Sequence, residues 1–419
     1  MTTHALRNRL LHGLLAASVL IQGCGGGGGG NSTSTATGTT STSGTNTVVA
    51  AASNVQPISV NSGLGGTVNL AFTSITLCAP GSNNCQTVDN ILIDTGSSGL
   101  RVMASALPAS LSLPQQKDAF GNPLVECAHF VDGYTWGPVK QADLRIAGER
   151  ANSLAVQVIG DSTFPLVPRR CAATGPSKNS ASTLRANGIL GLAIFPQDCG
   201  DACATSGSPG IYYICPATGC QTAAVPLAQQ LQNPVTLFAS NNNGVIVELP
   251  SAPGGVAASL AGSLVFGIGT QANNGLGGAT VIGVDADTAN FTTVYNGATF
   301  SASFIDSGSN ALFFPDAGTP VCTDPAVAGF FCPSVTKNLT ATIQGRNGKL
   351  AAVGFGLANA SEMVRNNPGF AVFGNLGAPQ LALGSGSFDW GLPFFYGRNV
   401  YVAITGANTP AGTGPYVAF

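Results

Sequence analysis

The sequence predicts an all-β protein. Only 8% of the residues are charged, and the chain contains 56 Gly and 25 Pro, whereas a typical soluble domain has ~25% charged residues. Short runs rich in Val, Ile, Thr and Phe lie between Gly, Asn and Pro, a pattern typical of strands joined by tight turns. Helical periodicity is scarce, and Ala224 to Gln232 is the best candidate for a helix.

Residues 1–24 have the features of an export signal. Two Arg residues precede an apolar stretch at 14–21, and small residues follow. The sequence IQGC at 21–24 resembles the lipobox of bacterial lipoproteins, which implies that Cys24 carries a lipid anchor; a plain secretory signal is the alternative. Gly25 favours the outer membrane of a bacterial cell envelope, because the inner-membrane retention signal resembles Asp at this position.

Residues 25–52 are predicted to be a disordered tether. They consist almost entirely of Gly, Ser, Thr, Asn and Ala, carry no charge, and cannot bury enough apolar surface to fold. No later stretch has 18 uninterrupted apolar residues, so we expect the lipid to be the membrane contact. The remaining residues, 53–419, are numerous enough for two domains. With 16 basic and 18 acidic residues, no basic patch indicates nucleic acid as a partner.

The cysteines predict a disulfide framework. Ten follow Cys24, an even number in a chain that leaves the cytoplasm, so five disulfides are the simplest interpretation. Two pairs bracket short loops and a third pair remains, while four cysteines crowd one Pro- and Gly-rich insertion, where their pairing stays open and zinc is an alternative. The three expected pairs are Cys78 with Cys85, Cys127 with Cys171 and Cys322 with Cys332; the crowded four are Cys199, Cys203, Cys215 and Cys220.

One sequence pattern occurs twice. ILIDTGSSGLRV at 91–102 and SFIDSGSNALFF at 303–314 each place an Asp, a hydroxyl residue, Gly and Ser directly after an apolar strand. A single Asp-Thr-Gly is most often an ordinary turn. Two copies after matched strands instead indicate a pair of carboxylates, Asp94 and Asp306, that shares one proton and activates a water molecule.

The residues around the two Asp have a mechanical purpose in this interpretation. Glycine allows a turn too tight for a Cβ, and hydroxyl groups can hold a carboxylate by hydrogen bonds. We expect these residues to support the Asp pair, although Ser98 and Ser309 fit a plain turn equally well. The supporting set is Thr95, Gly96, Ser97, Ser98, Ser307, Gly308 and Ser309.

Other kinds of catalytic site find little support in the sequence. Two of the three His residues leave with the export signal, and we expect the third, His129, to be structural. No G-x-S-x-G elbow, P-loop or complete G-x-G-x-x-G occurs. Carboxylates are therefore the candidates for acid and base chemistry, and no cofactor or metal site is predicted.

The repeat and four further segments resemble the pepsin-like aspartic peptidases. NGILGLA at 187–193 is similar to the segment that crosses under the active-site loop, and 132–148 is similar to the flap hairpin, which places Tyr134 over the cleft. GSLVFG at 262–267 and WGLPFFYGRNVYVAI at 390–404 are similar to later segments of that family. The resemblance implies a two-lobed all-β fold with the active-site cleft between the lobes. We assign 53–250 to the N-terminal lobe, which includes the flap and the Cys-rich insertion, and 251–419 to the C-terminal lobe.

The chain departs from this family at two places. Arg101 stands where Trp is usual, so the expected hydrogen-bond partner of the flap Tyr134 is missing, and Trp136 on the same hairpin is a possible substitute. The crossing segment of the C-terminal lobe reads Asp389-Trp390-Gly391 instead of two aliphatic residues and Gly. Val372-Phe373-Gly374 is a rival alignment for it.

We expect an aspartic endopeptidase, a hydrolase in which an Asp pair activates water to cleave peptide bonds. The alternative is a catalytically weak or inactive surface lipoprotein of the same fold that binds peptide or protein; a structural β-rich lipoprotein is a third possibility. The expected partners are a peptide or protein substrate and the membrane, through the lipid, with the protein itself a monomer. Residues 25–100 contain no Lys or Arg, so no basic prosegment has to be removed.

Overall fold

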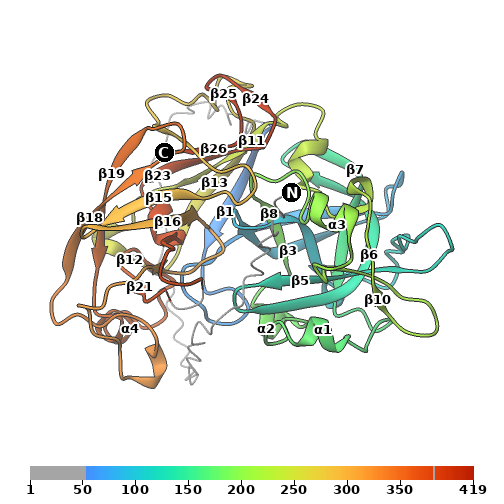
Figure 1. The fold of residues 1–419 in the computed structure, drawn as a ribbon, viewed down its shortest axis with the longest axis horizontal. Helices are drawn as coiled ribbons and strands as arrows, with labels where there is room; N and C mark the ends of the chain where they lie inside the picture. Colours follow the sequence, from blue (N-terminus) through green and yellow to red (C-terminus); the bar gives the residue numbers. More distant parts are fainter. Residues whose placement is uncertain (1–52, 381–382) are drawn as a thin grey trace, which may run out of the picture.

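The computed structural model describes residues 53–380 and 383–419. The expected lipidation site Cys24 and the expected tether at 25–52 lie outside these residues. Strands make up 41% of the structure and helices 11%, which confirms the all-β prediction. Figure 1 shows the early strands gathered on one side of the molecule and the late strands on the other.

The largest sheet has fifteen strands and runs through both halves of the molecule. The two halves meet where β1 pairs with β13, over Val55–Val60 and Leu260–Phe266. In spatial order the strands are β10 (Gln221–Thr222), β9 (Tyr212–Ile214), β5 (Leu124–Phe130), β6 (Gly133–Ile146), β7 (Glu149–Ile159), β4 (Ser98–Met103), β8 (Gly188–Leu192), β3 (Cys85–Asp94), β2 (Ala71–Cys78), β1, β13, β11 (Gly244–Leu249), β23 (Arg398–Ala403), β26 (Tyr416–Ala418) and β14 (Val281–Gly283).

A second sheet of seven strands belongs to the C-terminal half, and two pairs of short strands complete the β structure. The seven strands are, in spatial order, β19 (Leu350–Leu357), β18 (Lys337–Gln344), β15 (Phe291–Tyr295), β16 (Ala298–Ile305), β22 (Asp389–Trp390), β17 (Leu312–Phe313) and β21 (Gly377–Ala378). The short pairs are β12 (Val256–Ala257) with β20 (Val372–Phe373) and β24 (Asn408–Thr409) with β25 (Gly412–Thr413).

Helices are few and short, and the one expected at Ala224 to Gln232 was wrong. That segment holds only the 3-10 turn η2, Leu227–Gln229, because Pro226 and Pro234 restrict the chain on both sides. The α-helices are α1 (Arg169–Ala172), α2 (Ala181–Leu184), α3 (Asp201–Thr205) and α4 (Ala360–Asn366). Other 3-10 turns are η1 (Ala104–Ala106), η3 (Pro234–Leu237), η4 (Pro253–Gly255), η5 (Pro325–Val327) and η6 (Leu392–Phe395).

Five disulfides lie within the described residues; each closes a local segment, and none of them joins the two halves. The three expected pairs are confirmed. The crowded four pair as neighbours, Cys199 with Cys203 and Cys215 with Cys220. The longest span between paired cysteines is 44 residues, from Cys127 to Cys171, so the halves are held together by packing and hydrogen bonds.

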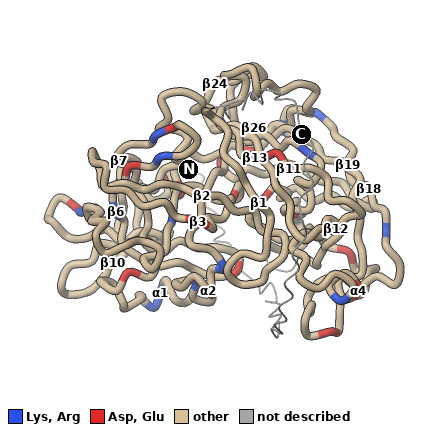
Figure 2. The backbone as a smooth tube through the Cα atoms, turned by 180° about the vertical axis from the view of Figure 1, so that it is seen from behind, with Lys and Arg blue, Asp and Glu red and all other residues tan. Residues whose placement is uncertain are grey.

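Charged residues are spread thinly over the molecule. Figure 2 shows them singly or in small groups along the backbone, separated by long uncharged stretches. In the residues that the structure describes, no helix has the length and apolar character needed to cross a membrane.

Candidate active site

The two Asp residues end equivalent strands in the two halves. Asp94 is the last residue of β3, and Asp306 directly follows β16. Each strand pairs in parallel with a crossing strand, β8 or β22, and that crossing strand pairs antiparallel with the strand after the Asp loop, β4 or β17. The repeated sequence pattern thus corresponds to a repeated arrangement of three strands.

Glycine in each crossing strand lets it approach the Asp loop closely. A Cβ added to Gly191 would lie 2.7 to 2.8 Å from the backbone of Ser97, Ser98 and Gly99, and one added to Gly391 would lie 2.1 Å from the Ala311 carbonyl oxygen. Neither approach is compatible with a larger side chain. Because β22 makes this crossing, residues 389–391 form the C-terminal segment, whereas the rival 372–374 contributes to β20.

The glycines after the two Asp show how closely the carboxyl groups lie. A Cβ on Gly96 would be 2.8 Å from Asp306 Oδ1, and a Cβ on Gly308 would be 2.9 Å from Asp94 Oδ1 and 3.1 Å from Asp306 Oδ1. The Oδ1 atoms of Asp94 and Asp306 therefore both lie about 3 Å from the same Cβ position on Gly308, which limits the distance between them. One water molecule can bridge oxygens at such a separation.

Two hydroxyl residues cross between the Asp loops. The Thr95 amide donates to Ser307 Oγ at 3.1 Å, and the Ser307 amide donates to Thr95 Oγ1 at 2.9 Å. Ser307 Oγ also donates to the Ile93 carbonyl at 2.8 Å, and Thr95 Oγ1 to the Ile305 carbonyl at 3.5 Å. Thr95 and Ser307 are buried, so these bonds hold the loops together out of contact with water.

Serine holds each carboxyl group from the side. Ser97 Oγ donates to Asp94 Oδ2 at 2.5 Å, and Ser309 Oγ lies 2.9 Å from Asp306 Oδ2. The amides of Gly96 and Gly308 donate to the Oδ1 atoms of their own Asp, at 2.8 and 2.7 Å. Each carboxyl group is thus fixed at both oxygens.

Ser98 has a different task from the other serines. Its hydroxyl donates to the Phe195 carbonyl at 2.7 Å, and its own carbonyl accepts from Arg101. It therefore anchors the Asp94 loop to neighbouring segments and does not contact either carboxyl group directly.

Asp306 has a raised proton affinity. Burial, followed by the neighbouring Asp94 charge, raises the pKa of Asp306 to about 8. Two carboxylates in contact cannot both ionise readily, so the pair keeps one proton over a wide pH range. Gly96 is exposed and Ser97 is half-buried, which leaves this edge of the pair open to solvent.

A third carboxyl group, not predicted from the sequence, lies beside the pair. Asp389, the first residue of β22, is 4% exposed, and its Oδ2 is 2.6 Å from Ser309 Oγ. Burial, and then the charge of Asp306, raise its pKa well above the usual range. The signal was visible, because an acid replaces an apolar residue in the crossing segment, but the sequence could not show its contact with Ser309.

Arg101 lies in a buried ionic network, and its guanidinium also lies over the Phe130 ring. Its guanidinium is 2.6 Å from Glu126 Oε1 and 3.2 Å from Asp198 Oδ2, and it donates to the Ser98 carbonyl at 2.9 Å. Tyr212 donates to Asp198 Oδ1 at 2.6 Å. The sequence marked Arg101 as unusual, but its partners come from β5, the 198 loop and β9, which no local pattern connects.

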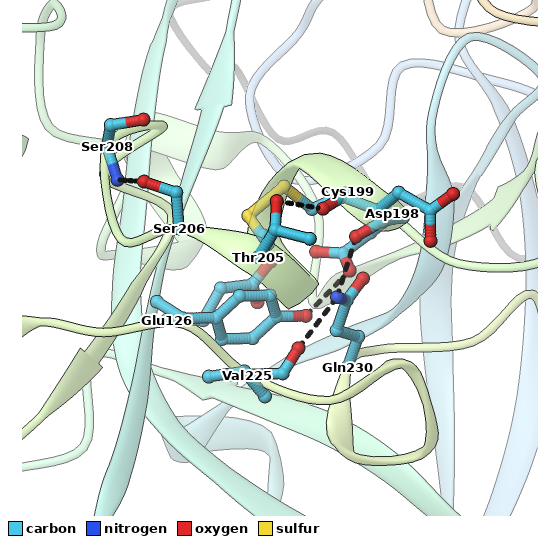
Figure 3. Close-up of a disulfide and its surroundings, with 12 residues drawn as sticks. Glu126, Asp198, Cys199, Thr205, Ser206, Ser208, Val225 and Gln230 are labelled. Carbon is cyan, nitrogen blue, oxygen red and sulfur yellow. Dashed lines mark hydrogen bonds between the residues drawn. A yellow bond between two sulfur atoms is a disulfide. The ribbon is translucent and has the colours of Figure 1, made fainter.

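The Cys-rich insertion packs against this network. Figure 3 shows the Cys199–Cys203 disulfide with Asp198 on the same segment and Gln230 nearby. The Gln230 side-chain amide donates to the carbonyls of Gly200 and Val225, both at 2.9 Å. The disulfide therefore secures the segment that supplies Asp198.

The expected flap is a hairpin of β5 and β6, with both its aromatic residues buried. Tyr134 and Trp136 belong to one apolar cluster with Tyr213. Trp136 Nε1 donates to the Phe164 carbonyl at 3.0 Å, so the suggestion that Trp136 is the hydrogen-bond partner of Tyr134 was wrong. His129 is half-buried on β5, opposite Tyr134.

Among the described residues, no cluster of three or more His, Cys, Asp or Glu side chains is arranged to hold a metal ion. Comparison with curated proteins gives no match. The model of one protein family, described as "Protein of unknown function (DUF3443)", matches residues 50–419. Because this match covers most of the sequence and every strand described above, the chain belongs to the DUF3443 family.

Proposed function

We propose that this protein is an aspartic endopeptidase with a two-lobed, pepsin-like fold. The observation that carries the proposal is the pair of carboxyl groups at Asp94 and Asp306, which equivalent strands bring together and crossed hydroxyl contacts hold. An isolated turn would need neither the second carboxyl group nor the crossing contacts.

The proposed mechanism uses one ionised and one protonated Asp. The ionised carboxylate takes a proton from a bound water, the water attacks the peptide carbonyl, and the protonated carboxyl group donates to the oxyanion or leaving nitrogen. No covalent intermediate with the protein forms. The raised pKa of Asp306 fits the role of the proton donor, with Asp94 as the base.

The deciding experiment compares Asp94→Asn, Asp306→Asn and the double variant on an unfolded protein substrate. Because the two carboxyl groups act as one unit, each single change should abolish cleavage almost as completely as both together. Asp89→Asn is the matched control, since Asp89 is an exposed residue of the same strand β3. It should retain full activity.

Inhibitor binding separates the peptidase from the alternative, a surface protein of this fold that only binds peptide. A statine-type inhibitor imitates the tetrahedral intermediate and should bind the wild-type protein but neither Asn variant. If the folded wild type neither cleaves substrate between pH 3 and 8 nor binds the inhibitor, the peptidase proposal falls and the binding protein replaces it.

We also propose that Cys24 carries a lipid that anchors the protein in the bacterial cell envelope, on the basis of the sequence at 21–24. Metabolic labelling with a fatty acid should mark the wild-type protein. A Cys24→Ser variant that still takes up the label would contradict the anchor.

A further inference from the structure

The hydrogen bonds of Ser309 require a proton on one of its neighbours. Ser309 Oγ lies 2.9 Å from Asp306 Oδ2 and 2.6 Å from Asp389 Oδ2. A serine hydroxyl has a single hydrogen, and an ionised carboxylate can only accept. Two hydrogen bonds at these distances therefore need one of the two carboxyl groups to be a neutral acid that donates to Ser309 Oγ.

Asp389 is the better candidate for that neutral acid. It is 4% exposed, and its Oδ1 has no hydrogen-bond partner among the residues that the structure describes. An ionised carboxylate with an unpaired oxygen in such surroundings is costly, whereas a neutral acid tolerates them.

The charges near Asp389 point the same way. The charged groups that act on it are Asp306 and Asp94, both acidic. None of the ion pairs in the described part of the chain includes Asp389. No cation therefore offsets a negative charge on it.

We propose that Asp389 is a third carboxyl group of this site, held as a neutral acid that donates its Oδ2 proton to Ser309 Oγ. Ser309 must then direct its own hydrogen to Asp306 Oδ2. Asp389 is a positioning residue: it acts through Ser309, fixes the direction of that hydrogen bond, and leaves Oδ1 of Asp306 to face Asp94. This role in catalysis rests on the proposed peptidase function, whereas the protonation of Asp389 does not.

The N-terminal half shows what the site would be without this group. The residue equivalent to Asp389 is Ile189, since both lie on the crossing strand two residues before its glycine. The hydroxyl of Ser97, the equivalent of Ser309, donates to Asp94 Oδ2, and among the described residues it has no second carboxyl group as a partner. Replacing Asp389 by an apolar β-branched residue thus gives the C-terminal half the arrangement that the N-terminal half already has.

Infrared spectroscopy tests the protonation directly, with no need for a substrate. At about pH 7, where ordinary carboxyl groups are ionised, the wild-type protein should show the carbonyl band of a buried carboxylic acid that is missing from both Asp389→Asn and Asp389→Val. Asp89→Asn, at an exposed position, should leave this carboxylic-acid band in place. If Asp389→Asn removes a carboxylate band instead, Asp389 is ionised and the proposal is wrong.

Activity against pH tests the positioning role. Asn can still donate to Ser309, so Asp389→Asn should keep kcat/KM within about threefold of wild type. Asp389→Val and Ser309→Ala should each lose about tenfold and change the pH profile, and the double variant should be no worse than Ser309→Ala alone. Equal losses in Asp389→Asn and Asp389→Val, with melting temperatures near wild type, would overturn this role. An inactive wild type would refute the peptidase, while the infrared result would still decide the state of Asp389.

Discussion

Each half of the site has one polar residue in the strand pair next to its Asp loop, but on different strands. In the N-terminal half it lies on the strand after the loop, and in the C-terminal half it lies on the crossing strand. In the N-terminal half Arg101 on β4 lies opposite Ile189 on β8, whereas in the C-terminal half Phe313 on β17 lies opposite Asp389 on β22. Both polar residues reach the nearby Asp loop, Arg101 through the Ser98 carbonyl and Asp389 through the Ser309 hydroxyl. The two Asp loops therefore sit in the same arrangement of strands, but a cation contacts the loop of Asp94 and a carboxyl group contacts the loop of Asp306.

The buried charge of the N-terminal half should have the largest effect on stability. Arg101→Met leaves the carboxyl groups of Glu126 and Asp198 buried without their cation, which should lower the free energy of unfolding by about 3 to 5 kcal/mol. Chemical denaturation of the wild type and the variant measures this change in the free energy of unfolding.

The matched control is Arg346→Met, which removes an exposed ion pair with Asp285 and should cost less than about 1 kcal/mol. If the two variants lost the same free energy of unfolding, the buried network would add no more to stability than an exposed ion pair. The proposed difference between the halves would then be wrong.

The glycines after the two Asp should be equally intolerant of change, because they face each other's carboxyl groups. Gly96→Ala and Gly308→Ala each put a Cβ about 3 Å or less from the opposite carboxyl group, and the resulting displacement should reduce kcat/KM by about 100-fold. Gly278→Ala, where a Cβ meets nothing within 4 Å, should leave activity unchanged. A tolerated alanine at only one of the two sites would show that the halves contribute unequally to the pair.

The hydroxyl groups of Ser307 and Thr95 should contribute unequally to stability, although both cross between the Asp loops. Ser307 Oγ makes two bonds near ideal length, whereas the bond from Thr95 Oγ1 to the Ile305 carbonyl is stretched to 3.5 Å. Ser307→Ala should therefore cost about 2 kcal/mol and Thr95→Val about 1 kcal/mol. Thermal unfolding of both variants measures the difference, and the reverse order would contradict these distances.

Titration of the pair should give a smaller, pH-dependent effect. The pKa of Asp306 is raised from 3.8 to about 8 in the folded protein, so the folded state holds this proton more tightly than the unfolded chain does. Its contribution to stability is complete below about pH 4 and is lost as the pH rises through about 8. Denaturation of wild type and Asp306→Asn at pH 5 and pH 8 should show a weaker pH dependence in the variant; an identical dependence would place the raised pKa elsewhere.

Local patterns were enough to predict the fold class and two disulfides, and a third disulfide, Cys127–Cys171, followed as the pair that remained. The all-β class follows from short apolar runs between turn residues, and the pairs Cys78–Cys85 and Cys322–Cys332 bracket short loops that a disulfide can close. The helix expected from periodicity at 224–232 failed because Pro226 lies within the segment and Pro234 lies just beyond it. Its isolated 3-10 turn depends on those prolines rather than on periodicity.

The parts of the site that escaped prediction depend on contacts between distant segments. The identities of Arg101 and Asp389 were noted as unusual, but the partners Glu126, Asp198 and Ser309 lie on other strands or loops. The substitute suggested for the partner of Tyr134, Trp136, was wrong, because proximity along a hairpin does not tell which way an indole N–H points. Such choices are made by packing in three dimensions.

The crossed contacts between the Asp loops have a consequence for the order of events in synthesis. Thr95 and Ser307 are 212 residues apart, so a chain still on the ribosome can complete the first loop long before the second exists. Contacts over such separations form late in folding, since long loops must close first. A growing or truncated chain therefore holds half of a site, and any hydrolytic activity must wait until the whole molecule is finished.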